Sequence, residues 1–164
     1  MTNNTAQNPL LDTTGLPKFD VFHVEHIEPA VECELEASRA QIQQLAEGDF
    51  IPSWDNFIEP LEKIDNRLER VWGPIGHLDS VKNSDEWHAA YSACLQKITA
   101  YHTEVGQNAA LFKKFKALSE SREFEDYSLA QKKVIENALR NFKLSGIDLP
   151  TEQQREYQQV KQQL

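Results

Sequence analysis

Residues 57–78, FIEPLEKIDNRLERVWGPIGHL, decide the fold of this chain. Their apolar side chains recur at alternating steps of four and three residues, which places them in one stripe along a helix. The members of the stripe are Phe57, Leu61, Ile64, Leu68, Val71, Ile75 and Leu78. Ser53 precedes the pattern and is a suitable N-cap. Because a helix gains most of its stability by burying such a face, the stretch predicts packing against other helices.

Two prolines lie inside this pattern. Pro60 is expected to kink the first turns, and Pro74 to bend or break the helix at Trp72-Gly73, because proline removes a backbone hydrogen bond from a helix interior. The apolar register continues on both sides of Pro74. We therefore predict two nearly collinear segments on the same core.

Comparable patterns fill the rest of the chain. They predict a first helix from about residues 26–29 to Gly48, a third from the cap Asn83-Ser84 to Gly106, a fourth over 108–118, a fifth over 128–144 and a sixth from Thr151, with 119–127 as a loop. In the first helix, one face carries Val31, Leu35, Ile42 and Leu45, and Ser38 fills the gap in this row. In the fifth helix, the residues expected to point inward are Leu129, Ile135, Ala138, Leu139 and Phe142. Thr151 and Gln154 predict a capping box.

These patterns predict an all-α fold. We expect a single antiparallel bundle of about five to six helices over residues 26–164, preceded by an extended leader at residues 1–25. Gly and Pro together make up only 13 of 164 residues, which suits long helices better than many short strands. The sixth pattern, with Tyr157, Val160 and Leu164, reaches the last residue without a stop signal, so we expect the helical domain to be truncated before this helix ends.

Composition excludes several classes of protein. With 26 acidic and 17 basic residues the net charge is −9, which argues against nucleic-acid and anionic-membrane partners. No apolar run approaches the roughly 20 residues of a membrane span, and the polar start is unlike a signal peptide. Cys33 and Cys94 do not form a disulfide framework. A cytoplasmic location is therefore expected.

The densest group of metal-capable side chains is His23-Val24-Glu25-His26. Residues i and i+3 share a helix face, so both imidazoles are able to reach one zinc ion, with Glu25 or Glu28 as a further ligand. The alternative is a capping segment with solvated polar groups. His88 and His102, 14 residues apart, would lie about 21 Å apart along a helix and cannot share an ion. These two and His77 are interpreted as boundary residues.

Other candidates have similarly ordinary explanations. No His is followed by Glu, and no Gly-rich phosphate loop or Cys-x-x-Cys occurs, so we predict no catalytic or metal-binding residue in this chain and leave substrate-binding residues open. Five aromatic residues either line a ligand groove or belong to the core, namely Trp54, Trp72, Trp87, Tyr91 and Tyr101. Cys33 and Cys94 are interpreted as core or boundary residues, and Lys113-Lys114-Phe115-Lys116 as the solvated face of the fourth helix.

Four stretches carry a resemblance to a known family. They are Asn8-Pro9-Leu10-Leu11, His26-Ile27-Glu28-Pro29-Ala30-Val31, residues 77–84 (HLDSVKNS) and residues 130–147, which begin AQKKVIENALR. Taken in order, they resemble the N-terminal region of the thimet oligopeptidase family of zinc metallopeptidases, and the resemblance covers nearly the whole chain.

This resemblance implies a function for a longer parent protein. Enzymes of the family cleave short peptides at a zinc ion held by His-Glu-x-x-His and a distant Glu, which lie downstream of residue 164, so zinc is expected in the parent and no cofactor in this chain. The piece would form part of the helical wall of a substrate channel, be inactive alone, and have the remainder of its own chain and oligopeptide substrates as partners. The alternative is a stand-alone helical module that binds a peptide or protein without catalysis.

Overall fold

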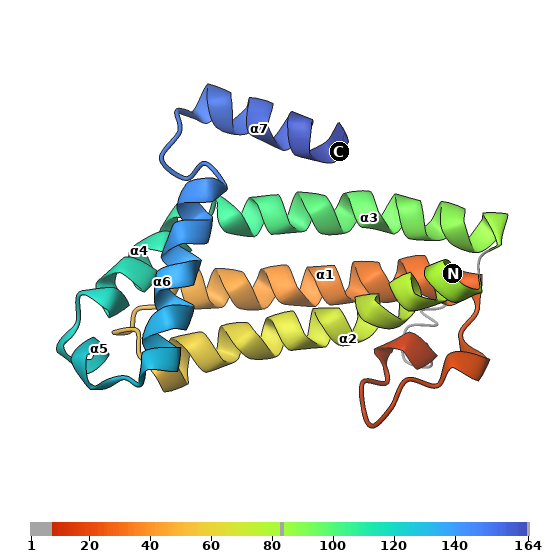
Figure 1. Cartoon of the computed structure of the whole chain (residues 1–164), viewed down its shortest axis with the longest axis horizontal. Coiled ribbons are helices and arrows are strands. Elements are labelled where there is room, and N and C mark those ends of the chain that lie inside the picture. The colour runs from red at the N-terminus through yellow and green to blue at the C-terminus, as the bar shows by residue number, and fades with distance from the viewer. Residues whose placement is uncertain (1–7, 83, 164) are drawn as a thin grey trace. The chain divides into compact units, whose positions relative to one another are not determined.

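A computed structural model describes residues 8–82 and 84–163. These residues contain seven α-helices and no strand, which confirms the predicted all-α helical bundle (Figure 1). The helices are α1 (Val24–Glu47), α2 (Glu59–Val81), α3 (Asp85–Gly106), α4 (Ala109–Ser119), α5 (Arg122–Asp126), α6 (Leu129–Leu144) and α7 (Thr151–Gln163). Short helical turns occupy Pro9–Leu11, Phe19–Val21 and Trp54–Ile58. The predicted cap at Asn83, the apolar position Leu164 and leader residues 1–7 lie outside the described residues.

Contacts within the chain divide it into two compact units. Unit 1 comprises Met1–Ile42 and Leu61–Ile98, and unit 2 comprises Gln43–Pro60 and Thr99–Leu164. The first part of α1, most of α2 and the first part of α3 therefore belong to unit 1. The ends of α1 and α3, with α4 to α7, belong to unit 2.

In unit 1, three helical segments lie side by side and alternate in direction (Figure 1). They bury the stripes expected from the sequence, with Val31, Leu35, Ile64, Leu68, Val71, Ile75, Leu78, Cys94 and Ile98 in the core. Ser38 is completely buried, as its place in the apolar row of α1 predicted. The leader adds Leu10 and Phe22 to the buried residues. The core of unit 1 is thus assembled from segments on both sides of the short connection at residues 48–53.

Helix α2 is one continuous helix, so of the bend or break expected at Trp72-Gly73, the break is wrong. Pro74 itself is buried, next to Val71 and Ile75 on the core face. Proline costs one hydrogen bond and a steric conflict with the preceding turn, and burial of apolar residues on both sides offsets that cost. Pro60 lies at the second position of α2, directly after a wide π-type turn at Trp54–Ile58 that Ser53 caps through the amide of Asn56.

The core of unit 2 is aromatic. Phe115 lies between Phe57 and Phe142, with ring centroids 5.0 and 5.5 Å away, and Phe112 lies 5.7 Å from Phe142. Asn108 caps α4 by accepting hydrogen bonds from the amides of residues 110 and 111. The rings belong to the connection before α2, to α4 and to α6, so these segments are packed together by their aromatic side chains.

Four local expectations are corrected. Helix α1 begins at Val24, before the expected start at residues 26–29. Residues 119–127 are not all loop, because Ser121 caps the short helix α5. Leu129 is 87% exposed, because it lies six positions before the buried Ile135, which puts it about 120° away around the helix.

The fourth correction concerns the start of α7, where the expected Thr151–Gln154 capping box is not formed. The backbone amide of Gln154 donates to the carbonyl of Pro150, which makes Pro150 the N-cap. The side-chain amide of Gln154 donates instead to the carbonyls of Ile147 and Leu149, at 3.2 and 3.0 Å. Gln154 therefore ties the helix start to the connection before it.

Candidate functional site

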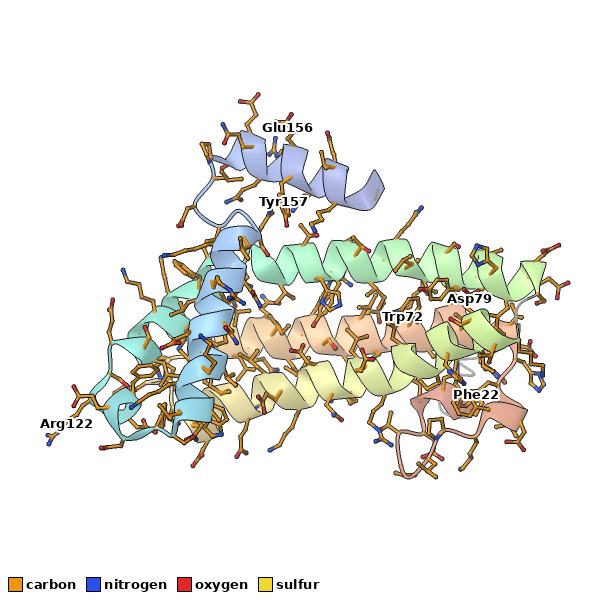
Figure 2. The ribbon with its side chains drawn as sticks, viewed as in Figure 1. Phe22, Trp72, Asp79, Arg122, Glu156 and Tyr157 are labelled. Atoms are coloured by element: carbon orange, nitrogen blue, oxygen red, sulfur yellow. The ribbon has the colours of Figure 1, made fainter. Side chains whose placement is uncertain are left out.

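Unit 1 contains a pocket of about 400 Å³, which we call the leader pocket. Its buried lining consists of Phe22 from the leader, Leu78 from the end of α2 and Trp87 from the start of α3. Phe19 and Val24 complete the apolar lining. Figure 2 shows Phe22 on the leader, close to the last turns of α2. The pocket therefore forms where the leader crosses the ends of two helices.

Polar side chains complete the lining of the leader pocket. His23 and Lys82 are exposed, and Ser84 accepts a hydrogen bond from the backbone amide of Trp87 at 3.2 Å. The indole nitrogen of Trp87 donates to the carbonyl of Ile75 at 3.1 Å. The ring of Trp87 is thus fixed by a buried hydrogen bond, and an apolar cavity with a few polar groups is the usual form of a small-ligand site.

A second cluster in unit 1 joins α2 to α3. The rings of Trp72 and Tyr91 are stacked at 4.9 Å with an interplanar angle of 7°. Figure 2 shows Trp72 directed from α2 toward α3. Nδ1 of His88 lies 3.1 Å from a carboxylate oxygen of Asp79, and the His88 ring lies 6.4 Å from Tyr91. Trp72 and Tyr91 are half-buried, so this cluster is packing between helices with one exposed edge.

The five aromatic residues singled out from the sequence are divided between the two units. Trp72, Trp87 and Tyr91 belong to unit 1, and Trp54 and Tyr101 belong to unit 2. Tyr101 is buried, whereas Trp54 is half-buried and packs edge-on against Tyr127 at 6.1 Å. Of the five, Trp87 alone lines the leader pocket.

The histidine cluster at the start of α1 has a capping role. Nδ1 of His26 accepts a hydrogen bond from the backbone amide of His23 at 3.1 Å, and the two rings lie 5.5 Å apart. Among residues 8–82 and 84–163, no group of three or more His, Cys, Asp or Glu side chains is arranged to hold a metal ion. The described residues thus do not fit a zinc site. His77 and His102 are exposed.

The two cysteines are free thiols. Cys33 is half-buried on α1, and Cys94 is fully buried on α3. Burial raises the pKa of the Cys94 thiol to about 11, and the nearby ammonium of Lys97 only partly counteracts that shift. The thiolate is the nucleophilic form, and the raised pKa disfavours it. Cys94 is therefore a core residue, one of the two positions expected for it from the sequence.

Three charged pairs in unit 1 were not predicted from the sequence. Lys97 contacts Glu28 and Glu32 at 2.5 Å each, and these hydrogen bonds raise the pKa of its ammonium. Arg67 contacts the buried Glu34 at 2.6 Å. These partners lie 33 to 69 residues apart in the sequence, so no local spacing announces them.

Lys114 corrects the interpretation of the basic run on α4. Lys113 and Lys116 are exposed, but the ammonium of Lys114 donates to the carbonyls of Gly48 and Phe50 at 2.5 and 3.0 Å. It also lies 3.9 Å from the centroid of the Phe50 ring. Lys114 thus holds the turn after α1, instead of belonging to a solvated face.

No helix in the described part of the chain is both long enough and apolar enough to cross a lipid bilayer.

Comparison with known proteins gives a consistent assignment. Residues 31–154 match the model of the N-terminal domain of neurolysin and thimet oligopeptidase. The chain is 47% identical to oligopeptidase A of Haemophilus influenzae over 95% of its own length, and 39% identical to oligopeptidase A of Escherichia coli over 93%. It is 34% identical to a probable cytosolic oligopeptidase A of Arabidopsis thaliana over 97%.

The aligned part is a small portion of each relative. The chain spans only 22% to 23% of the length of these three curated relatives. The family model covers more than half of this chain and is specific to one domain. The chain therefore belongs to the neurolysin and thimet oligopeptidase family and corresponds to its N-terminal domain.

Proposed function

We propose that this chain is the N-terminal helical domain, residues 26–164 with the leader at residues 1–25, of a zinc-dependent oligopeptidase that hydrolyses short peptides. The observation that carries the proposal is the match of residues 31–154 to the family's N-terminal domain, together with relatives whose names state that they are oligopeptidases. The chemistry of peptide hydrolysis would belong to the remainder of the full-length chain.

The role proposed for this domain is to form part of the wall of the substrate channel. Its helices are fixed by buried apolar stripes and by long-range pairs such as Arg67 with Glu34, and a wall that restricts access must be rigid. A cytoplasmic location of the parent agrees with the two free cysteines, since thiols stay reduced there.

The division of labour is tested by comparing the 164-residue chain with its full-length parent. The parent is expected to cleave an internally quenched oligopeptide, to lose that activity on dialysis against a chelator and to regain it with zinc. The 164-residue chain is expected to show neither turnover nor stoichiometric zinc after the same dialysis. Tightly retained zinc in the short chain, or a coding sequence without His-Glu-x-x-His after codon 164, would contradict the proposal.

The channel-wall role needs a separate experiment. An oligopeptide carrying a photoreactive residue is irradiated on the full-length protein, and the cross-linked sites are mapped by mass spectrometry. Cross-links within residues 8–163 that disappear with excess unlabelled peptide are expected. Cross-links confined to the rest of the parent would exclude a wall role for this domain. The alternative of a stand-alone interaction module without catalysis predicts saturable peptide cross-links to the 164-residue chain by itself.

A further inference from the structure

The leader pocket has the size and composition of a site for one large residue. Its volume of about 400 Å³ lies at the lower end of the range for ligand pockets, which is roughly 300–1,000 Å³. Five of its eight described lining residues are apolar or aromatic. Three of these, Phe22, Leu78 and Trp87, are themselves buried, so the inner surface is already fixed by the fold. A preformed apolar surface of this size suits an aromatic or branched aliphatic side chain.

The charged group in the lining of the pocket indicates which polar group the ligand carries. Lys82 carries the only formal charge among the eight described lining residues, and none of them is a carboxylate. This is unusual in a chain with a net charge of −9. Asp20, Asp85 and Glu86 are adjacent in sequence to lining residues and lower the potential around the pocket. A simple anion is therefore disfavoured, and burial of an apolar group must provide most of the affinity.

We propose that the leader pocket binds the C-terminal residue of an oligopeptide, with its apolar side chain against Phe22, Leu78 and Trp87 and its free carboxylate at the ammonium of Lys82. Ser84 and His23 supply polar groups for the last peptide bond. That the ligand is a peptide rests on the proposed function. The site itself rests on the geometry of unit 1 and takes no part in hydrolysis.

Binding is measured on the 164-residue chain by titration with acetyl-Gly-Gly-Phe, followed through the indole N–H signals in a proton–nitrogen correlation spectrum. The chain has three tryptophans, so three indole signals are expected, and tryptophan-to-phenylalanine variants assign them. The Trp87 signal should shift saturably. The Trp54 signal, from unit 2, should not move. No saturable shift of Trp87 overturns the proposal.

The carboxylate contact is tested with the C-terminal amide of the same peptide. The amide should bind about threefold to fivefold more weakly, as expected for one exposed ion pair. Lys82→Gln should abolish this difference without changing the affinity for the amide, while Lys113→Gln, an exposed lysine on α4, should preserve it. Phe19→Ala should weaken the binding of both peptides, because Phe19 lines the pocket. Phe19 is also partly exposed in the free chain. Equal affinity of wild type for acid and amide contradicts the role of Lys82.

Other occupants give distinct results in the same experiment. Free phenylalanine should bind more weakly than the acetylated peptide, because its ammonium group must also lose water. If it binds as tightly, the pocket is a site for free amino acids and the peptide assignment is wrong. A shift of Trp87 on concentrating the chain alone would place a second copy in the pocket and also overturn it. The titration measures binding and no hydrolysis, so failure of the zinc and turnover tests would leave the binding result unaffected. Failure to bind the peptide would likewise leave the zinc and turnover tests unaffected.

Discussion

Nε of Arg67 on α2 donates a 2.6 Å hydrogen bond to Oε1 of Glu34 on α1, a residue that is only 6% exposed. Ser38 donates to the same oxygen at 3.3 Å. Nη2 of Arg67 has neither solvent exposure nor a hydrogen-bond partner in the described structure. The pair thus supplies a buried carboxylate with donors but leaves one nitrogen of the Arg67 guanidinium, Nη2, unsatisfied.

Removing one member of this pair should destabilise the fold. Arg67→Met keeps the aliphatic part of the side chain but leaves the Glu34 carboxylate buried with only the Ser38 hydroxyl. We expect the free energy of unfolding, measured by urea denaturation, to fall by about 1–3 kcal/mol. The double variant Glu34→Met/Arg67→Met removes both charges and the unsatisfied donor. It should therefore be less destabilised than Arg67→Met, and the opposite order would refute this account of the pair.

Gly106 at the end of α3 is expected to reject a side chain. A Cβ atom placed there would lie 2.6 Å from Oγ and 2.8 Å from Cβ of Ser145, and the Cβ atom cannot rotate away. Gly106→Ala should lower the unfolding free energy by about 1–3 kcal/mol despite the better helix propensity of alanine. Thermal and urea unfolding provide the measurement.

Two variants control for this effect. Ser145→Gly in the Gly106→Ala background should restore most of the loss, because it removes the atoms that clash. Gly76→Ala on α2 places its Cβ in ordinary contact, 3.6 Å from Tyr91, and should leave the stability unchanged or raise it by up to about 1 kcal/mol. A loss at Gly76 equal to that at Gly106 would show that steric conflict is not the cause.

Lys114 should contribute to stability although its neighbours in the basic run do not. Lys114→Met removes two charge-assisted hydrogen bonds to the carbonyls of Gly48 and Phe50, and we expect a loss of about 1–2 kcal/mol in urea denaturation. Lys113→Met is the matched control, since this side chain is exposed and should change the stability by less than about 0.5 kcal/mol. Equal effects of the two substitutions would rule out a special role for Lys114.

Tyr127 is expected to titrate late. Burial, and then its hydrogen bond to the carboxylate of Glu123, raise the pKa of the Tyr127 phenol to about 12 from an ordinary value of 10. Because the folded state favours the protonated phenol, its contribution to stability is complete below pH 10 and is lost as the pH rises from 10 to 12. In an ultraviolet phenolate titration of the folded chain, a phenol that ionises near pH 12 should be absent in Tyr127→Phe.

The same variant tests the structural role of this hydroxyl. It accepts from the backbone amide of Trp54 at 2.8 Å and donates to Glu123 at 2.8 Å. Tyr127→Phe should therefore be less stable than the wild type at pH 8, and the difference should shrink above pH 10. A difference that stays constant across this range would contradict the raised pKa.

Helix positions followed from the sequence because apolar spacing is a local property. The stripe from Phe57 to Leu78 and the buried Ser38 needed only the helical period to be recognised. Helix α5 has too few residues to show a period, and its one signal was Ser121, whose hydroxyl accepts from the amide of Phe124. Short helices of this kind depend on capping more than on burial.

The leader pocket and the charged pairs could not be read from the sequence for a different reason. Phe22 and Trp87 are 65 residues apart, and the pocket exists only because the leader crosses the ends of α2 and α3. Glu34 was indistinguishable from the other acidic residues near the start of α1 until its partner Arg67 was in place. Local spacing does not encode which distant segments meet.

Asn8, the first described residue, has a practical consequence for anyone who prepares shortened versions of this domain. Its side chain accepts from the amide of Leu10 and donates to the carbonyl of His26, so one amide group ties the leader to the first turn of α1. Leu10 is almost completely buried behind it. A protein engineer who starts the chain at the first long helix would open the side of unit 1 and expose apolar surface to aggregation, whereas an affinity tag joined ahead of residue 8 leaves this anchor in place.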